Sequence, residues 1–113
     1  MEKLIKKIRE FADERDWEQF HSPKNLSMAL AVEAGEILEH FQWLTEEESR
    51  SLDTKTLNKV KEEIGDVQIY LARLADQLGF SPLQTAHEKL EQNQKKYPAS
   101  KSKGSAKKYT ELK

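Results

Sequence analysis

The sequence predicts an all-α fold, a four-helix bundle formed by a chain of 113 residues. Apolar residues recur at three- and four-residue spacing through most of the chain, which is the period of an α-helix. Only four glycines and three prolines interrupt this pattern, and no segment alternates apolar and polar side chains as a half-buried strand does. The length suits one domain. We expect residues 1–98 to form this domain and residues 99–113, which are rich in lysine and serine, to form a basic C-terminal tail.

The first two helices are predicted from their apolar stripes and their caps. The first covers about residues 2–15, and its inner stripe comprises Leu4, Ile8 and Phe11. The second begins at Ser22 and Pro23, because serine is a favoured N-cap and proline fits the first helical turn. It runs to about Trp43.

A short helical turn and two further helices follow. Thr45 with Glu48 indicates a capping box for the short turn. The long helix spans about residues 54–78 and ends at Gly79. Its apolar residues repeat at spacings of three and four, which predicts close packing against a partner helix; they are Leu57, Val60, Ile64, Val67, Leu71, Leu74 and Leu78. The last helix begins at Ser81-Pro82 and ends before Tyr97-Pro98.

Charge and composition narrow the classes of function. The net charge is -1, but residues 99–113 hold five lysines and one glutamate, so the rest of the chain sums to about -5. An acidic body disfavours a nucleic-acid-binding surface. The absence of cysteine excludes disulfides and thiolate zinc sites and fits a cytoplasmic protein. No apolar run approaches the ~20 residues of a membrane span, and no glycine-rich loop follows a strand as a P-loop or dinucleotide-binding fold requires.

Two short strings share one pattern of acidic residues. Glu33 and Glu36 are three residues apart with a glycine before the second acid, and Glu63 and Asp66 repeat this arrangement. Acids with this spacing lie on nearly the same face of a helix. If the two helices present these pairs to each other, four carboxylates converge, and they cannot all stay ionised without a cation.

The alternative is that these acids are solvated helix charges, since 35% of the residues are charged. Two features favour a site. Glu33 lies within the apolar stripe of its helix, between Leu30 and Ile37, where an unpaired carboxylate is costly. Gly35 and Gly65 stand in mid-helix, each at a cost of about 1 kcal/mol. We expect them to allow a close approach of the two backbones.

The chemistry of the candidate ligands indicates which metal they would hold. All four are hard oxygens, which favours Mg²⁺, with Mn²⁺ also possible, over zinc. Mg²⁺ keeps waters and prefers phosphate oxygens, so we expect a phosphorylated ligand. His40 lies on the same side of its helix as Glu33 and Glu36. We expect it to be a packing or surface residue, with an outer contact to the acids as the alternative.

Aromatic and basic residues accompany the acids. Flat side chains near a metal–phosphate site can stack on a base, and the alternative is packing between helices. Lysines and an amide on one face of the last helix can grip phosphates, and the alternative is a solvated helix end favoured by the dipole. The first set comprises Trp17, Phe20, His21, Asn25, Trp43 and Tyr70, and the second comprises Lys89, Asn93, Lys96 and Tyr97.

Taken together and in order, these strings resemble the all-α, MazG-like nucleoside triphosphate pyrophosphohydrolases, and most closely their dCTP pyrophosphatase branch. The resemblance covers about residues 8–112. The matching strings are Arg15-Asp16-Trp17-Glu18-Gln19-Phe20-His21, Pro23-Lys24-Asn25-Leu26, Glu33-x-x-Glu36 with Phe41-Gln42-Trp43, Glu63-x-x-Asp66-Val67 with Ile69-Tyr70-Leu71, Lys89-x-x-x-Asn93 with Tyr97-Pro98, and Lys108-Tyr109-Thr110-Glu111-Leu112.

The resemblance implies an enzyme of the nucleotide pool. Members cleave a (deoxy)nucleoside triphosphate, here expected to be dCTP or a modified dCTP, to the monophosphate and pyrophosphate, and they assemble as homodimers or homotetramers. It implies catalytic, Mg²⁺-binding roles for Glu33, Glu36, Glu63 and Asp66. The implied substrate-binding residues are Trp17, His21, Trp43 and Tyr70 at the base, and Lys89, Asn93, Lys96 and Tyr97 at the triphosphate. Asn25 is also expected to bind the substrate.

Two other hypotheses stay open from the sequence. One is the same chemistry with a broad or different deoxynucleotide specificity, such as dUTP. The other is a non-catalytic helical protein that binds a nucleotide without releasing pyrophosphate.

Overall fold

The computed structural model describes residues 1–106, and every regular element within them is helical. This confirms the all-α prediction; residues 107–113, which include the string 108–112 and the end of the expected tail, lie outside the described residues. The chain divides into two compact units, Met1–Phe80 and the residues from Ser81 onward. The elements are α1 (Glu2–Glu14), the 3₁₀ turn η1 (Glu18–Phe20), α2 (Pro23–Glu39), α3 (Glu46–Ser49), α4 (Thr54–Leu78), α5 (Pro82–Lys96) and α6 (Ala99–Ser102).

Polar caps begin the helices at the predicted positions. The hydroxyl of Ser22 accepts a hydrogen bond from the backbone N–H of the third residue of α2 at 3.1 Å, and Ser81 caps α5 in the same way. Thr45 and Glu48 form the expected reciprocal capping box at α3. α4 ends where Gly79 turns into the left-handed region at φ 83°, a conformation that glycine adopts without strain.

The regular part of α2 is shorter than predicted. It ends at Glu39, and the next residues continue as hydrogen-bonded turns. The backbone N–H groups of Phe41 and Gln42 both donate to the carbonyl oxygen of Leu38, at 2.9 and 2.8 Å. Sharing one carbonyl tightens the end of a helix. Trp43 follows on this turn with its side chain 87% exposed.

A 3₁₀ turn that was not predicted joins α1 to α2. Asp16 has a φ of 53°, which aspartate tolerates better than most residues. Its carbonyl and carboxylate oxygens accept hydrogen bonds from the side chain of Gln19 at 3.0 and 3.2 Å. The reversal brings the ring of Trp17 edge-on against that of Phe11, with centroids 5.5 Å apart.

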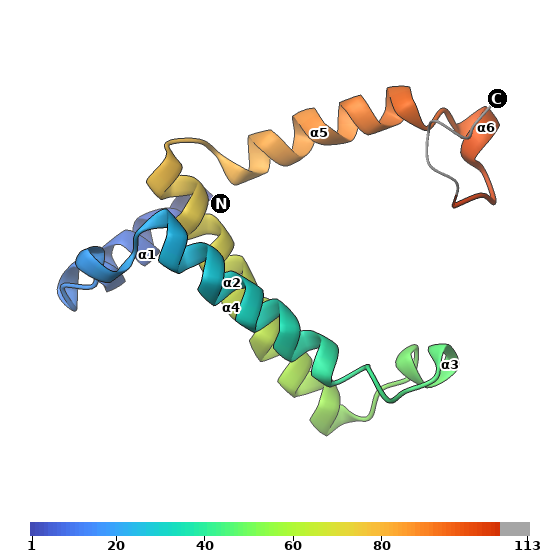
Figure 1. Cartoon of the computed structure of the whole chain (residues 1–113), viewed down its shortest axis with the longest axis horizontal. Coiled ribbons are helices and arrows are strands. Elements are labelled where there is room, and N and C mark those ends of the chain that lie inside the picture. The colour runs from blue at the N-terminus through green and yellow to red at the C-terminus, as the bar shows by residue number, and fades with distance from the viewer. Residues whose placement is uncertain (107–113) are drawn as a thin grey trace. The chain divides into compact units, whose positions relative to one another are not determined.

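Within the first unit, α2 and α4 lie side by side and antiparallel, and α1 packs against α4 (Figure 1). The apolar core between them is small. A chain of this size usually buries more apolar surface, so the helices keep apolar faces that another layer could cover. The buried apolar residues of the described chain are Ile8, Ala12, Leu26, Val60, Ala72 and Ala75.

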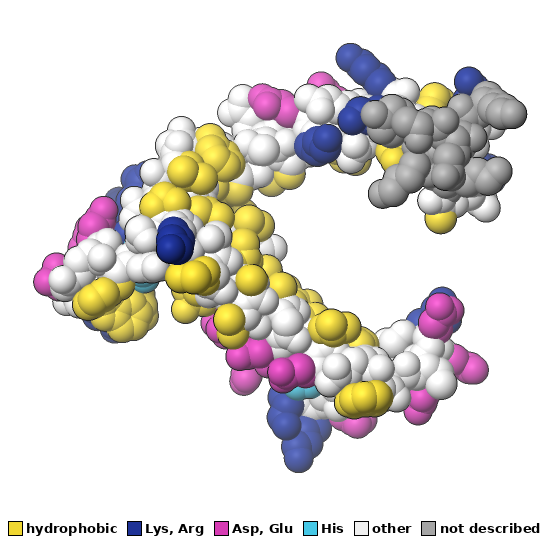
Figure 2. Space-filling model, in the orientation of Figure 1, with side chains coloured by type: hydrophobic (Ala, Val, Ile, Leu, Met, Phe, Trp, Pro, Cys, Tyr) yellow, Lys and Arg dark blue, Asp and Glu magenta, His cyan; other side chains and the backbone are white. Residues whose placement is uncertain are grey.

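The apolar seam predicted on α4 divides into two lines. Val60 is buried and Val67 and Leu74 are half-buried, so the predicted close packing is confirmed for this line. The other line recurs every seven residues, which keeps it on one face of the helix, and it is exposed. Figure 2 shows hydrophobic side chains along the surface of the α2–α4 pair. The exposed line comprises Leu57, Ile64, Leu71 and Leu78, with exposed fractions of 40%, 47%, 43% and 55%.

The second unit is built on α5. None of the residues of α5 is buried, and Leu83 and Leu90, which lie on one face, are exposed. The first residues of the expected tail form the single turn α6. Among residues 1–106, no helix combines the length and the apolar character that crossing a bilayer requires.

Candidate metal centre and nucleotide-binding residues

The four predicted acids lie together where α2 packs against α4. Glu33 and Glu36 project from α2 and are half-buried; on α4, Glu63 is half-buried and Asp66 is exposed. The pKa of Glu33 is raised, first by burial, then by Glu36, and further by Asp66 and Glu63. Because all three other carboxylates act on Glu33, the acids form one electrostatic cluster. We call these four residues the acid cluster.

Two oxygens of the acid cluster are buried without a hydrogen-bond partner among the described residues. They are the Oε2 atoms of Glu33 and Glu63. An unpartnered buried carboxylate oxygen is costly, and native proteins rarely keep one without a proton, a water or an ion. Over residues 1–106, no three side chains are already arranged as a complete metal-ligand set. The acid cluster therefore has the donor chemistry for a hard divalent cation without a preformed coordination shell.

His40 contacts the acid cluster from the turn that ends α2. Its Nε2 lies 2.7 Å from Oε2 of Glu63. The contact is an ion pair when the imidazole is protonated, and it is not a directed hydrogen bond, since this oxygen has no hydrogen-bond partner. The sequence left two roles open for His40, and the contact with Glu63 agrees with the second of them, an outer contact to the acids.

The glycines of the acidic strings do not have the function that their positions suggested. A Cβ atom added at Gly35 or Gly65 would meet no atom within 4 Å. The prediction that these glycines allow the backbones of α2 and α4 to approach closely within one chain is therefore wrong. Glutamate side chains are long enough to meet across the usual helix–helix distance of about 8–10 Å, so the acid cluster needs no such approach.

Residues 17–21, which we call the aromatic turn, precede α2 and are held in place by neighbouring side chains. The rings of Trp17 and His21 meet edge to face with centroids 6.1 Å apart. The side-chain amide of Asn25 donates to the carbonyl oxygen of Phe20 at 3.0 Å, and that of Gln77 donates to the carbonyl oxygen of His21 at 3.1 Å. Asn25, predicted to bind substrate, thus has a structural contact that anchors the turn.

Arg73 is a residue of this region that the sequence analysis missed. It is only 4% exposed. Its Nε–H donates to Nδ1 of His21 at 3.3 Å, and its Nη2 donates to the carboxylate of Glu18 at 3.1 Å. A signal was present in the sequence, because a polar line with spacings of three and four runs beside the apolar seam of α4. This line comprises Glu63, Asp66, Tyr70, Arg73 and Gln77.

Glu18 and His21 have the Glu-x-x-His spacing that di-iron bundles use. Both side chains contact the guanidinium of Arg73. A permanent positive charge between them disfavours a second cation there. This pair is therefore part of the aromatic turn and not a metal site.

The other predicted residues belong to other elements of the chain. Trp43 and Trp17 are on opposite ends of α2, whose 17 residues measure about 25 Å. Tyr70 is half-buried on α4, one helical turn beyond Asp66. The residues predicted for the triphosphate belong to the second unit: Lys89 and Lys96 are exposed, and Asn93 and Tyr97 are half-buried at the end of α5.

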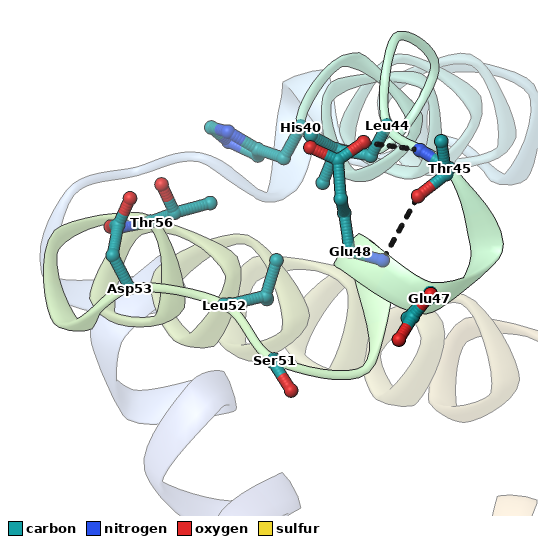
Figure 3. A pocket seen from close by; sticks show the side chains of 9 residues that line it. All are labelled: His40, Leu44, Thr45, Glu47, Glu48, Ser51, Leu52, Asp53 and Thr56. Carbon is teal, nitrogen blue, oxygen red and sulfur yellow. Dashed lines mark hydrogen bonds between the residues drawn. The ribbon is translucent and has the colours of Figure 1, made fainter.

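A cavity of about 470 Å³ opens next to His40, between the end of α2 and the start of α4 (Figure 3). Two of its acids already have local partners. Glu48 accepts the backbone N–H of Thr45, and Asp53 accepts that of Thr56. These backbone hydrogen bonds lower the pKa of both carboxyl groups. Glu48 and Asp53 therefore serve as helix caps and do not extend the acid cluster.

Known proteins share this sequence and fold. A family model described as the MazG-like family matches residues 28–112. dCTP pyrophosphatase 1 of Mus musculus is 45% identical over 105 residues, which cover 91% of this chain and 62% of that protein. The Homo sapiens protein of the same name is 43% identical over an equal span. A pyrophosphatase of Archaeoglobus fulgidus, known from a crystal structure, is 40% identical with a TM-score of 0.81, covering 87% of this chain and 92% of that one.

The chain spans about three fifths of the length of these curated relatives. The family match includes both acidic strings, the turn with Trp43 and the whole of α4 and α5. Family and solved structure agree with the all-helical architecture described above. The chain belongs to the MazG-like family.

Proposed function

We propose that this chain hydrolyses a deoxynucleoside triphosphate, dCTP or a modified dCTP, to the monophosphate and pyrophosphate. The names of the two curated relatives support the substrate, and the name of the solved structure supports the pyrophosphate chemistry. The observation in this chain that carries the proposal is the acid cluster, in which the other three carboxylates act on Glu33. Converging carboxylates suit a reaction whose substrate is a phosphate chain accompanied by a cation.

The acid cluster is proposed to hold Mg²⁺, for which Mn²⁺ can substitute. The buried oxygens of Glu33 and Glu63 accept no hydrogen bond, and the pKa of Glu33 is raised. A bound cation would relieve both. Glu36 and Asp66 complete the set of hard oxygen donors. When bound, the ion neutralises phosphate charge and polarises the phosphorus. Glu36 or Glu63 accepts the proton of the attacking water.

The polar line on α4 connects the acid cluster to the aromatic turn. Asp66 and Arg73 are seven residues apart, about 10 Å along the helix, and Tyr70 lies between them. A separation of this size is within the reach of one nucleotide. We therefore assign the base to Trp17, His21 and Tyr70, and the phosphates to the acid cluster.

A second copy of the chain completes the site in this account, as a homodimer or homotetramer. The exposed line on α4 has no partner helix in the first unit, and symmetric pairing would cover it. Pairing would also allow Trp43 of one copy to approach the aromatic turn of another. Residues 1–98 form the catalytic bundle, with α5 supplying contacts to the triphosphate and residues 99–113 as a basic tail. The contacts on α5 are Lys89, Asn93, Lys96 and Tyr97.

Pyrophosphate release tests this function. The protein is assayed with dCTP, a base-methylated dCTP, dUTP and the purine deoxynucleotides, each with Mg²⁺ or with a chelator. We expect the highest rate of pyrophosphate release with dCTP or its methylated form, and the corresponding deoxycytidine monophosphate as the second product. With chelator, we expect no pyrophosphate to be released. Glu63→Gln should lose at least about a hundredfold in rate while the helical content is retained.

The matched control is Glu62→Gln, because Glu62 is exposed and adjacent on the same helix but points about 100° away from Glu63. It should keep wild-type turnover. Equal rates on all pyrimidines would establish the broader specificity instead. A folded protein that binds dCTP and releases no pyrophosphate would contradict catalysis and establish the non-catalytic hypothesis.

A further inference from the structure

We infer that Arg73 is a positioning residue that holds His21 as a neutral imidazole with its proton on Nε2. The inference deepens the proposed function and rests on it in one respect, namely that His21 contacts the base. It concerns a residue outside the acid cluster, and it assigns a chemical form to one side of the nucleotide site.

The geometry fixes the tautomer through the donor and acceptor properties of the two side chains. Nε of Arg73 lies 3.3 Å from Nδ1 of His21, and the Nε–H is the donor. A guanidinium has only donors and is always protonated. Nδ1 must therefore be an unprotonated acceptor, and a neutral imidazole then carries its hydrogen on Nε2.

The charges around His21 keep Arg73 in this position. Nη2 of Arg73 donates to Glu18 on η1 at 3.1 Å, and Nη1 lies 3.8 Å from Asp76 on α4. Asp76 is held in turn by a bidentate ion pair with Arg9 of α1. Arg73 is the one buried charged residue among the described residues, and a buried guanidinium requires partners of this kind. Burial and the charge of Arg73 lower the pKa of His21, while Glu18 acts in the opposite direction.

The backbone of the aromatic turn has anchors other than Arg73. The amides of Gln77 and Asn25 bind the carbonyl oxygens of His21 and Phe20 directly. Replacing Arg73 should therefore change the proton positions on His21 while the turn stays in place. This separates a positioning role from a purely structural one.

The fixed tautomer has a consequence for the ligand. No described residue accepts a hydrogen bond from Nε2 of His21, so this N–H remains available as a donor. A neutral donor matches a carbonyl oxygen or an unprotonated ring nitrogen on the edge of a pyrimidine. A mixture of tautomers would offer an acceptor part of the time, which a carbonyl oxygen or an unprotonated ring nitrogen cannot use.

The test measures the imidazole directly, in the full chain and without nucleotide. Long-range ¹⁵N–¹H correlation NMR near neutral pH reports which ring nitrogen carries the proton, and His21→Gln assigns the signal. We expect wild-type His21 to be neutral with the proton on Nε2. Arg73→Met should populate both tautomers and raise the pH at which His21 is protonated. Arg73→Lys, which keeps a charge and a donor, should restore part of the wild-type population, and Arg50→Met, at an exposed arginine of the first unit, should change nothing.

In kinetic assays, Arg73→Met should have a KM about tenfold higher than wild type, which corresponds to a loss of about 1.4 kcal/mol of binding free energy. Its kcat should change little. A wild-type His21 that is charged, or that carries its proton on Nδ1, overturns the inference, as does an Arg73→Met spectrum identical to wild type. If Arg73→Met fails to fold, the wild-type tautomer alone decides. A fixed Nε2–H tautomer in a protein that releases no pyrophosphate supports the role of Arg73 and counts against the proposed function alone.

Discussion

Nε2 of His40 lies 2.7 Å from Oε2 of Glu63, so the end of α2 contacts the α4 side of the acid cluster. Both side chains are half-buried, and this same Oε2 atom of Glu63 is buried and accepts no hydrogen bond. Groups that contact a metal-binding carboxylate from outside orient it and tune its affinity. His40 is therefore expected to act on metal binding through Glu63.

Replacing His40 by alanine should weaken the response to the metal. Without the imidazole, Glu63 loses the group that orients its carboxylate, and the loss of an outer contact typically costs about 10- to 100-fold in metal affinity or activity. The Mg²⁺ concentration for half-maximal pyrophosphate release should rise by at least about tenfold. His87→Ala, at an exposed position on α5, is the control; equal Mg²⁺ dependence in the two variants would count against this role.

The raised pKa of Glu33 makes the stability of the metal-free protein depend on pH. A carboxyl group whose pKa is higher in the folded state than its ordinary value of 4.5 binds its proton more tightly when folded. Its contribution to stability is complete below pH 4.5 and is lost as the pH rises through the raised value. In Glu33→Gln this loss should be absent, so the variant should gain stability relative to wild type as the pH is raised.

Urea unfolding with chelator, at pH values on both sides of the Glu33 transition, measures this difference. Mg²⁺ added at the higher pH should stabilise wild type by mass action and should act more weakly on Glu33→Gln. A difference between the two proteins that does not change with pH would exclude Glu33 as the source.

Gly65 within α4 and Gly79, which ends this helix, should respond to alanine in opposite directions. A Cβ at Gly65 meets open space, so Gly65→Ala should raise the free energy of unfolding by about 1 kcal/mol through helix propensity. Gly79 has a φ of 83°, where a side chain costs about 1–2 kcal/mol, so Gly79→Ala should lower it. Thermal melts of the two variants make the comparison. A destabilised Gly65→Ala protein would mean that a second copy approaches α4 closely at this position.

The exposed line on α4 should be an interface between copies of the chain. Leu71→Glu places a charge at its middle, which is costly in a desolvated contact, so the variant should become monomeric. Gln68→Glu adds the same charge at an exposed polar position close by on α4, and it should leave the oligomer intact. Light scattering after gel filtration gives the masses. A monomeric wild-type protein, or an unchanged mass for Leu71→Glu, would contradict the interface.

The helices could be predicted well because their signals are local. Ser22, Thr45 and Ser81 cap helices through hydrogen bonds to residues three positions away. Such contacts can be predicted from the residues that are adjacent in the sequence. The pairing of the acids could also be predicted, since the position of Glu33 inside an apolar stripe indicates where its carboxylate must lie.

The rest depends on contacts between distant parts of the sequence. Arg73 meets His21 and Glu18 across 52 and 55 residues, and the 3₁₀ turn that brings them together follows from a left-handed Asp16 that no pattern of apolar residues reveals. The prediction that Gly35 and Gly65 allow a close backbone approach was wrong. A glycine in mid-helix lowers helix stability, which indicates that the position has some function, but the sequence does not indicate which function. The apolar seam of α4 was predicted to pack as a whole against one partner helix. One helix can cover only one of the two lines of this seam, so the other line stays exposed.

Binding of a divalent ion to the metal-free chain tests directly whether α2 and α4 share a metal site, since this measurement needs no substrate. Calorimetric titration with Mn²⁺ should give saturable binding to wild type and to Glu62→Gln, and at least about a hundredfold weaker binding to Glu33→Gln and Glu63→Gln. This result requires carboxylates of α2 and of α4 to share the ion. Wild-type affinity in Glu33→Gln, or equal weakening in Glu62→Gln, would contradict a shared site.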